Sequence, residues 1–191
     1  MPRRFEINLL PKEIQQIALF LDVDGTLYEI EKSPSLVRPC FRLQKKLHVV
    51  RNRLKGALGL ISGRSLDDLD RIFNKSQIPV AGNHGAQLRD ALRYKGCPAD
   101  TENVKGIIDK IGGLLNEQDN LYIENKGSNL TVHFRNSTSQ RKKIKNLIMK
   151  LVQYEPDFTY LEGKEVLEIK PLGHNKGTAI SYFMRTKPFI N

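Results

Sequence analysis

The sequence predicts an α/β protein in which a Rossmann-like parallel-sheet core carries a smaller inserted α+β cap. In the first part of the chain, short and continuously apolar runs that end in polar residues alternate with helical patterns, as in a parallel sheet. From about residue 88 the apolar and polar residues alternate instead, as they do in strands with one wet face. The chain has 191 residues, of which 39% are hydrophobic, enough for a substantial core.

The core is predicted from three strands and two helices that follow one another along the chain. The strands span 17–21, 57–61 and 78–82, and the helices span 38–53 and 65–73. Pro39 suits the first turn of a helix, and Ser65 suits an N-cap. Because Pro79 cannot donate to a sheet, the third strand should start there or lie at an edge.

The cap is predicted from the order helix, two strands, helix, two strands. Its helices span 104–115 and 140–152, and its strands span 121–124, 130–134, 158–161 and 166–169. Residues 125–129, with the sequence Asn-Lys-Gly-Ser-Asn, are typical of a hairpin turn. Because a last helix over 175–184 returns to the parallel layer, we assign residues 1–88 and 170–191 to the core and 89–169 to the cap.

Charge and cysteine content limit the kinds of binding partner and cysteine site that the sequence predicts. Lys and Arg number 31 against 21 Asp and Glu, and the formal charge of +10 favours anionic partners. The basic run 141–145 is more typical of the solvated face of an amphipathic helix than of a nucleic-acid site. With no bilayer-length apolar run and no signal-peptide pattern, we expect a cytoplasmic protein without nucleic-acid or membrane partners. Cys40 and Cys97 are too isolated for a disulfide framework or a thiolate zinc site.

Two carboxylates directly follow the first predicted strand. Asp22 and Asp24, in the run Asp-Val-Asp-Gly-Thr, emerge at the carboxyl edge of a parallel sheet, where such folds bind ligands. A carboxylate there can attack phosphorus, so Asp22 is the candidate nucleophile and Asp24 the candidate proton donor and acceptor. A calcium loop would have its glycine two residues later and a distal glutamate that is missing, which disfavours that alternative.

An apolar strand followed by Asp-x-Asp-Gly-Thr resembles the haloacid-dehalogenase-like superfamily. The resemblance implies Asp22 as nucleophile, Mg²⁺ as cofactor, metal ligation by Asp22 and Asp24, and a substrate contact from Thr26. Ser62, after the second strand, and Lys176, at the start of the late helix, match two further catalytic elements in order. Their hydroxyl and ammonium groups can hold phosphate and balance its charge. Taken alone, Ser62 could be a helix cap and Lys176 a solvated lysine.

Further motifs resemble the trehalose-6-phosphate phosphatases. They are Leu-Ile-Ser-Gly-Arg-Ser at 60–65, Ala-Gly-Asn-His-Gly-Ala at 81–86, Glu-Asn-Lys-Gly at 124–127, Val-His-Phe-Arg at 132–135 and Gly-Lys-Glu-Val-Leu-Glu-Ile-Lys-Pro at 163–171. The resemblance runs from about residue 20 to the end and implies a cap that closes over the sugar of trehalose 6-phosphate. The implied sugar contacts are Glu124, Lys126, His133, Lys164 and Glu168 from the cap and Arg64, Asn83, His84 and Arg89 from the core. Gln87 departs from the glutamate that is common in that family.

The same resemblance implies one more acidic segment, Gly-Asp-Asp-x-Thr-Asp-Glu, that completes the metal site. The chain ends at 187–191, Lys-Pro-Phe-Ile-Asn, where the strand before that segment should begin. We therefore expect a truncated core with impaired turnover. Two function classes stay open: a hydrolase that releases phosphate from trehalose 6-phosphate in trehalose biosynthesis, and a catalytically silent sugar-phosphate binder or inactive truncated remnant. Another capped sugar or polyol phosphatase and a nucleic-acid-binding module are weaker alternatives.

Overall fold

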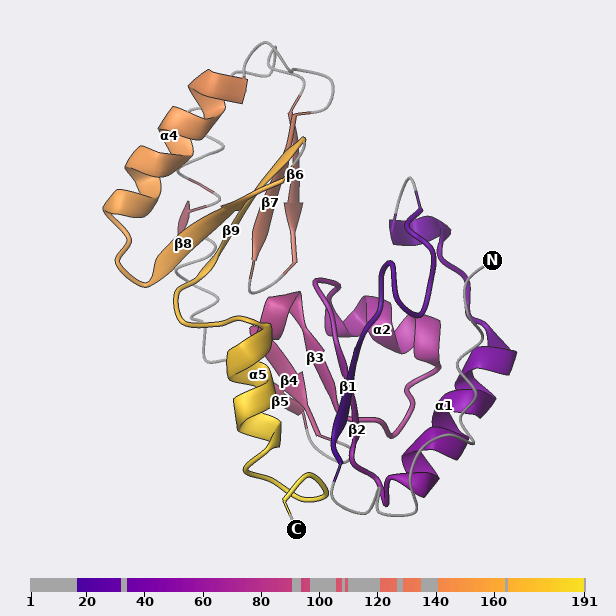
Figure 1. The fold of residues 1–191 in the computed structure, drawn as a ribbon. Coiled ribbons are helices and arrows are strands. Elements are labelled where there is room, and N and C mark those ends of the chain that lie inside the picture. The colour runs from indigo at the N-terminus through magenta and orange to yellow at the C-terminus, as the bar shows by residue number, and fades with distance from the viewer. Residues whose placement is uncertain are drawn as a thin grey trace.

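Two sheets make up the part of the chain that the computed structural model describes (Figure 1). That part comprises residues 17–31, 34–90, 94–96, 106–107, 109, 121–126, 129–134, 141–163 and 165–190. A five-stranded sheet has the order β1-β2-β3-β4-β5, and a four-stranded sheet has the order β6-β7-β9-β8. The predicted α/β fold, with a parallel sheet and a second antiparallel one, is confirmed.

The first sheet begins with three parallel strands, as predicted. They are β1 (Leu19–Asp22), β2 (Leu58–Ile61) and β3 (Val80–Gly82). Two antiparallel strands, β4 (Gln87–Arg89) and β5 (Tyr94–Gly96), extend it. The sequence did not predict these two, because a strand of three residues is too short to show a period. The sheet thus continues past residue 88, where the sequence placed the start of the cap, and the bounds of the cap stay a prediction.

Three α-helices flank the first sheet (Figure 1). They are α1 (Phe41–Arg53), α2 (Leu66–Phe73) and α5 (Lys176–Phe183), with 3₁₀ turns η3 (Pro34–Leu36) and η4 (Asn83–Gly85) between elements. Ser65 caps α2 as predicted, because its hydroxyl accepts the Asp68 N–H at 3.2 Å. α1 begins later than predicted, beyond Pro39, with Cys40 at the N-cap position. Strands and helices bury one core, whose innermost residues include Leu58, Leu60, Leu69, Ile72 and Phe183.

The second sheet is antiparallel throughout. Its strands are β6 (Tyr122–Asn125), β7 (Leu130–His133), β8 (Phe158–Glu162) and β9 (Val166–Pro171), which confirms both predicted strand pairs. α4 (Arg141–Gln153) packs on this sheet, and the two share a hydrophobic core separate from the first. Most of the helix predicted over 104–115 lies outside the described residues. Residues 106, 107 and 109 are helical, and Ile107 joins this second core.

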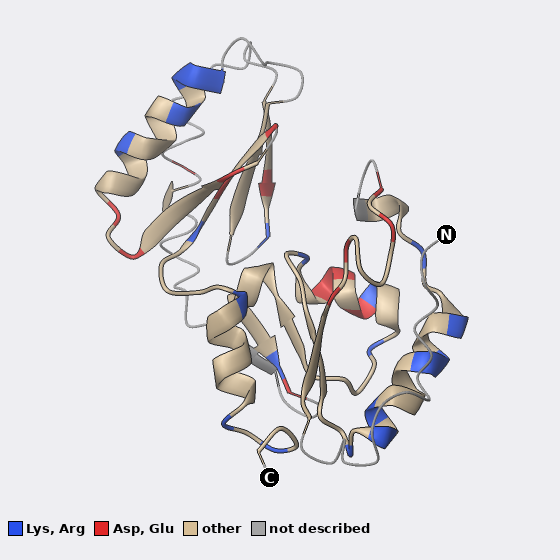
Figure 2. Cartoon of the chain, viewed as in Figure 1, with Lys and Arg blue, Asp and Glu red and all other residues tan. Residues whose placement is uncertain are grey.

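Basic residues gather along α1 and α4 (Figure 2). On α4, Arg141 and Lys145 pair with Glu162 of β8 at 2.8 and 2.5 Å, whereas Ile144 and Ile148 are buried. The basic run is therefore the outer face of an amphipathic helix, as predicted. Within the described ranges, no helix combines the length and apolar character needed to cross a bilayer.

Candidate active site

Asp22 lies at the carboxyl end of β1 and contacts a residue from the far end of the chain. Its Oδ2 accepts a hydrogen bond from the Lys176 ammonium at 2.5 Å, and its Oδ1 accepts the Val23 N–H at 2.8 Å. Both partners of the Asp22–Lys176 pair are about 40% exposed, so a ligand can reach them. β1 and β2 are in register from Asp22 to Ile61, so Ser62 follows β2 at the same sheet edge. The predicted grouping of a carboxylate and an ammonium is thus present.

The start of α5 positions Lys176. Asn175 and Thr178 form a reciprocal capping box, in which each side chain accepts the other residue's backbone N–H at 3.0 Å. Lys176 is therefore the first residue of the helix. Both its ammonium and the positive end of the helix dipole favour a negative group beside it. α5 follows closely on β9, so the second sheet leads straight into this corner of the site.

Arg64 holds Asp24 from the neighbouring loop. Its Nε and Nη2 donate to the two carboxylate oxygens of Asp24 at 2.7 to 3.1 Å, and its Nη1 donates to Asp68 at 2.9 Å. Burial by itself would lower the pKa of the Arg64 guanidinium, but hydrogen bonds to Asp24 and then Asp68 outweigh it and raise that pKa. Arg64 is thus a permanent cation that orients Asp24. Arg71 also pairs with Asp68, at 2.8 Å, and continues the network.

Ser62 is completely buried directly after β2. Its backbone N–H donates to the Ala81 carbonyl at 2.8 Å, and its carbonyl accepts the His84 N–H at 2.9 Å. Its hydroxyl oxygen accepts the Arg64 N–H at 3.1 Å, and a hydroxyl in that position still has a hydrogen to donate. Because Ser65 caps α2, the helix-cap alternative does not describe Ser62.

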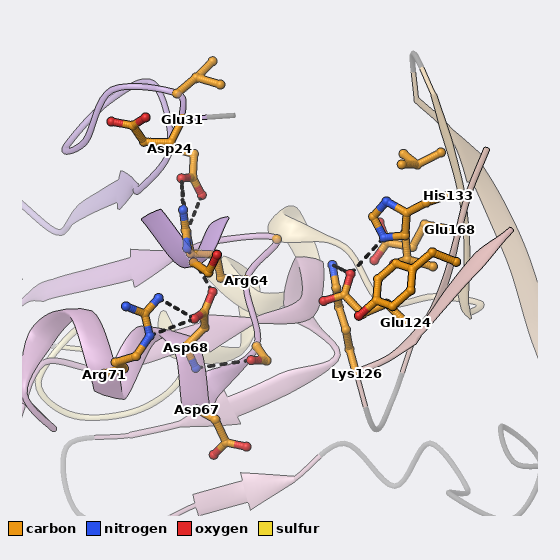
Figure 3. A pocket seen from close by; sticks show the side chains of 17 residues that line it. Asp24, Glu31, Arg64, Asp67, Asp68, Arg71, Glu124, Lys126, His133 and Glu168 are labelled. Carbon is orange, nitrogen blue, oxygen red and sulfur yellow. Dashed lines mark hydrogen bonds and ion pairs between the residues drawn. The ribbon is translucent and has the colours of Figure 1, made fainter. Parts of the chain in front are cut away.

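A cavity of about 790 Å³ lies between the two sheets. Figure 3 shows Asp24, Arg64, Asp68 and Arg71 on one side of it and Glu124, Lys126, His133 and Glu168 on the other. The His133 Nε2 lies 3.0 Å from Glu124 Oε2, and the Lys126 ammonium lies 3.9 Å from the same oxygen. Of the candidate catalytic residues, Asp24 lines this cavity. The other three, Asp22, Ser62 and Lys176, lie outside its lining. The volume falls in the range of about 300–1,000 Å³ typical of small-molecule sites.

Two predicted sugar contacts of the core touch the second sheet directly. The Asn83 side-chain amide donates to the Lys126 carbonyl at 3.0 Å, and His84 Nε2 lies 3.3 Å from Glu168 Oε2. Both core residues adopt the left-handed backbone region, with φ of 46° and 55°. Asn129 donates to the other Glu168 oxygen at 2.6 Å. These contacts therefore join the loop after β3 to the second sheet.

The contacts of Glu168 should make the stability of the protein depend on pH. Burial would raise the pKa of its carboxyl, but hydrogen bonds with His84 and Asn129 outweigh burial, so the pKa lies below the ordinary 4.5. A carboxyl with a depressed pKa in the folded state stabilises the protein above its unfolded pKa, and that stability is lost as the pH falls further. We expect the free energy of unfolding to fall more steeply below pH 4.5 in the wild type than in Glu168→Gln.

Urea unfolding from about pH 7 to about pH 3 checks this expectation. Glu29→Gln, which alters an exposed glutamate after β1, is the matched control and should keep the wild-type slope. Equal acid slopes for the wild type and Glu168→Gln would show that the contacts of Glu168 do not depress its pKa.

The remaining predicted contacts lie elsewhere or cannot be placed. Arg89 pairs with Asp70 of α2 at 2.6 Å and does not line the cavity. Thr26 is exposed in the loop after β1, also outside the cavity lining, and Lys164 lies outside the described residues. Gln87 uses its side-chain oxygen to accept the Leu66 N–H at 3.0 Å, so the amide that replaces the usual glutamate supports the start of α2.

The cavity is also lined by residues that the sequence did not predict for the site, among them Asp68, Arg71 and Tyr122. Asp68 and Arg71 read as ordinary surface charges of a helix. Tyr122 is the first residue of β6, and its alternation with Glu124 was the one available signal that both face the same side.

Comparison with known proteins identifies relatives along nearly the whole chain. The sequence pattern of the trehalose-phosphatase family matches residues 20–191. A probable trehalose-phosphate phosphatase of Sinorhizobium fredii is 32% identical over 184 residues, which cover 96% of this chain and 69% of that protein. A trehalose-6-phosphate phosphatase of Escherichia coli is 32% identical over 181 residues, which cover 94% and 68%.

Solved structures show the same fold. The C-terminal domain of a C. albicans trehalose-6-phosphate phosphatase superposes with a TM-score of 0.75 at 26% identity, over 90% of this chain and 63% of that one. A haloacid dehalogenase-like hydrolase of B. subtilis superposes with a TM-score of 0.60 at 14% identity, over 88% and 78%. The parallel sheet and these likenesses define a haloacid-dehalogenase-like fold. Within that class, the chain belongs to the trehalose-phosphatase family.

Proposed function

We propose that this chain hydrolyses trehalose 6-phosphate to trehalose and phosphate through an aspartyl-phosphate on Asp22. The observation that carries the proposal is the Asp22 carboxylate, which Lys176 holds at 2.5 Å at the sheet edge. Two residues further, Asp24 lines a cavity whose opposite wall is polar. Family membership supports phosphatase chemistry, and the names of the two relatives support the sugar. The cytoplasmic location and the lack of nucleic-acid and membrane partners remain predictions from the sequence.

The reaction proceeds in two displacements. An oxygen of Asp22 attacks phosphorus, and the bond between phosphorus and the sugar oxygen breaks. Asp24, once one of its oxygens leaves Arg64 and carries a proton, gives that proton to the sugar oxygen, so trehalose leaves as a neutral alcohol. Asp24 then takes a proton from a water molecule that attacks the aspartyl-phosphate, which releases inorganic phosphate and restores the carboxylate. Lys176 balances the negative charge on the nucleophile and on the phosphoryl oxygens.

The donor groups beside the nucleophile suit Mg²⁺. One Asp22 carboxylate oxygen and the Asp24 carbonyl would hold the ion, and both are the hard oxygen donors that it prefers. No cluster of three or more His, Cys, Asp or Glu suited to a metal occurs in the described ranges. The other positions around the ion would go to substrate phosphate, to water and to the further acidic ligands that the family resemblance implies. When bound, the ion neutralises charge on the phosphoryl group.

The wall formed by the second sheet supplies the sugar contacts. A disaccharide that leaves water needs a hydrogen-bond partner for each buried hydroxyl. Lys126 and His133 each lie within 4 Å of the same Glu124 oxygen, so donors and an acceptor stand together. Asn83 and His84 join this wall to the first sheet near the phosphate end, so one ligand can touch both parts.

Phosphate release with Mg²⁺ tests the function. We expect trehalose 6-phosphate to be cleaved at least about tenfold more efficiently than glucose 6-phosphate, because the second glucose ring adds contacts in the cavity. Equal rates with both substrates would indicate a general sugar phosphatase and contradict the proposed substrate. If no phosphate is released, calorimetric binding of trehalose 6-phosphate would establish a silent binder and contradict the proposed hydrolysis.

A further inference from the structure

We propose that Tyr122 is a stacking surface for a glucose ring and sets sugar specificity in the cavity between the sheets. The inference rests on the proposed function and deepens it, since it assigns a sugar contact to a residue outside the motifs that match the family. Its basis is the position of Tyr122 on β6, directly beside polar groups that can bind sugar hydroxyls.

Tyr122 faces the cavity from the same side of β6 as Glu124. Residues two apart on a strand share a face, and both of these line the cavity. Across the strand pair, Tyr122 stands opposite His133, with ring centroids 5.2 Å apart and an angle of 44° between the ring planes. His133 therefore steadies the tyrosine ring, and 64% of the Tyr122 surface still remains exposed.

The chemistry of this corner matches a hexose. A glucose ring has an apolar face of C–H bonds and a rim of hydroxyls, so it is recognised by an aromatic face next to polar groups. Tyr122 supplies the aromatic face. Glu124 and His133, which are 3.0 Å apart, supply an acceptor and a ring nitrogen for the hydroxyls. Lys126 adds a cation 3.9 Å from the same Glu124 oxygen.

An exposed tyrosine is common on protein surfaces, and the chain contains one for comparison. Tyr154, just beyond α4, is 81% exposed and does not line the cavity. Tyr122 differs because a second ring supports it and because charged side chains of the second sheet, of α2 and of the loops before it line the same cavity. Tyr154→Ala is therefore the matched control for Tyr122→Ala.

Calorimetric titration of the whole chain tests the inference with two ligands. For trehalose 6-phosphate, Tyr122→Ala should raise the dissociation constant about three- to tenfold, and Tyr122→Phe should keep it within about twofold. For inorganic phosphate, which reaches only the Asp22 end, neither variant should change the dissociation constant. Tyr154→Ala should match the wild type with both ligands.

The outcomes separate this inference from the proposed function. One outcome is that the wild type binds trehalose 6-phosphate more tightly than inorganic phosphate and that Tyr122→Ala keeps the same ratio of the two dissociation constants. In that case the stacking role is wrong and the function stands. If Tyr122→Ala weakens both ligands equally, the tyrosine supports the fold and not the sugar. If the wild type itself shows no preference for the sugar phosphate, the proposed function fails and the inference fails with it.

Discussion

Asp22→Asn should reduce phosphate release from trehalose 6-phosphate by at least about 10³-fold. An amide is a far weaker nucleophile than a carboxylate, so the aspartyl-phosphate cannot form. Folding should hardly change. The Asp22–Lys176 pair is about 40% exposed on both sides, and such solvated pairs stabilise a protein by no more than about 1 kcal/mol. Steady-state phosphate release and thermal unfolding, measured on the same preparation, check both parts.

The matched control is Asp67→Asn. It removes one negative charge from a carboxylate that lines the cavity but lies on the exposed side of α2. It should change the rate by less than about threefold, because it touches neither the nucleophile nor its partners. A rate for Asp22→Asn close to that of the wild type would show that another group attacks phosphorus.

Gly85→Ala should destabilise the fold by about 2–5 kcal/mol and also disturb the site. Gly85 has φ +97°, which is costly for any residue with a Cβ. A Cβ there would clash with the Asn175 carbonyl oxygen and lie 2.9 Å from its carbonyl carbon. Since Asn175 caps α5, relief of the clash shifts the helix start and moves Lys176 away from Asp22. The midpoint of urea unfolding and the rate of phosphate release should therefore both fall.

Gly173→Ala separates strain from the clash. Gly173 also has a positive φ, of +82°, but a Cβ there would meet no atom within 4 Å. Its cost should be only that of the backbone conformation, about 1–2 kcal/mol. Equal losses of stability in the two variants would show that the contact between η4 and α5 does not position the start of the helix.

The sequence predicted those parts of the fold that have a clear local pattern. The apolar runs that became β1 and β2 end at Asp22 and Ile61, and parallel pairing brings Asp22 and the following Ser62 to one edge. The second sheet was predicted from alternation around a hairpin turn. β4 and β5 escaped prediction because three-residue strands leave no period, and their pairing depends on neighbours that only the folded chain provides.

Side-chain partners were harder to predict than positions. Lys176 was placed beside Asp22 by resemblance, since 154 residues separate the two and no local pattern joins them. Arg64 lines the cavity, and its predicted sugar contact stays a prediction, but its pairing with Asp24 and Asp68 was not predicted; a buried guanidinium needs nearby carboxylates. Arg89 likewise pairs with Asp70. Such pairings depend on distances across the tertiary structure, and residue type alone does not supply them.

Only residues 172–175 separate β9 from α5, so a short stretch of backbone connects the two ends of the site. Glu168, which contacts His84, lies in the middle of β9, and Lys176, which contacts Asp22, is the first residue of α5. We therefore expect substitutions that alter the contacts of Glu168 to affect the Lys176–Asp22 pair as well, so the two should be measured together.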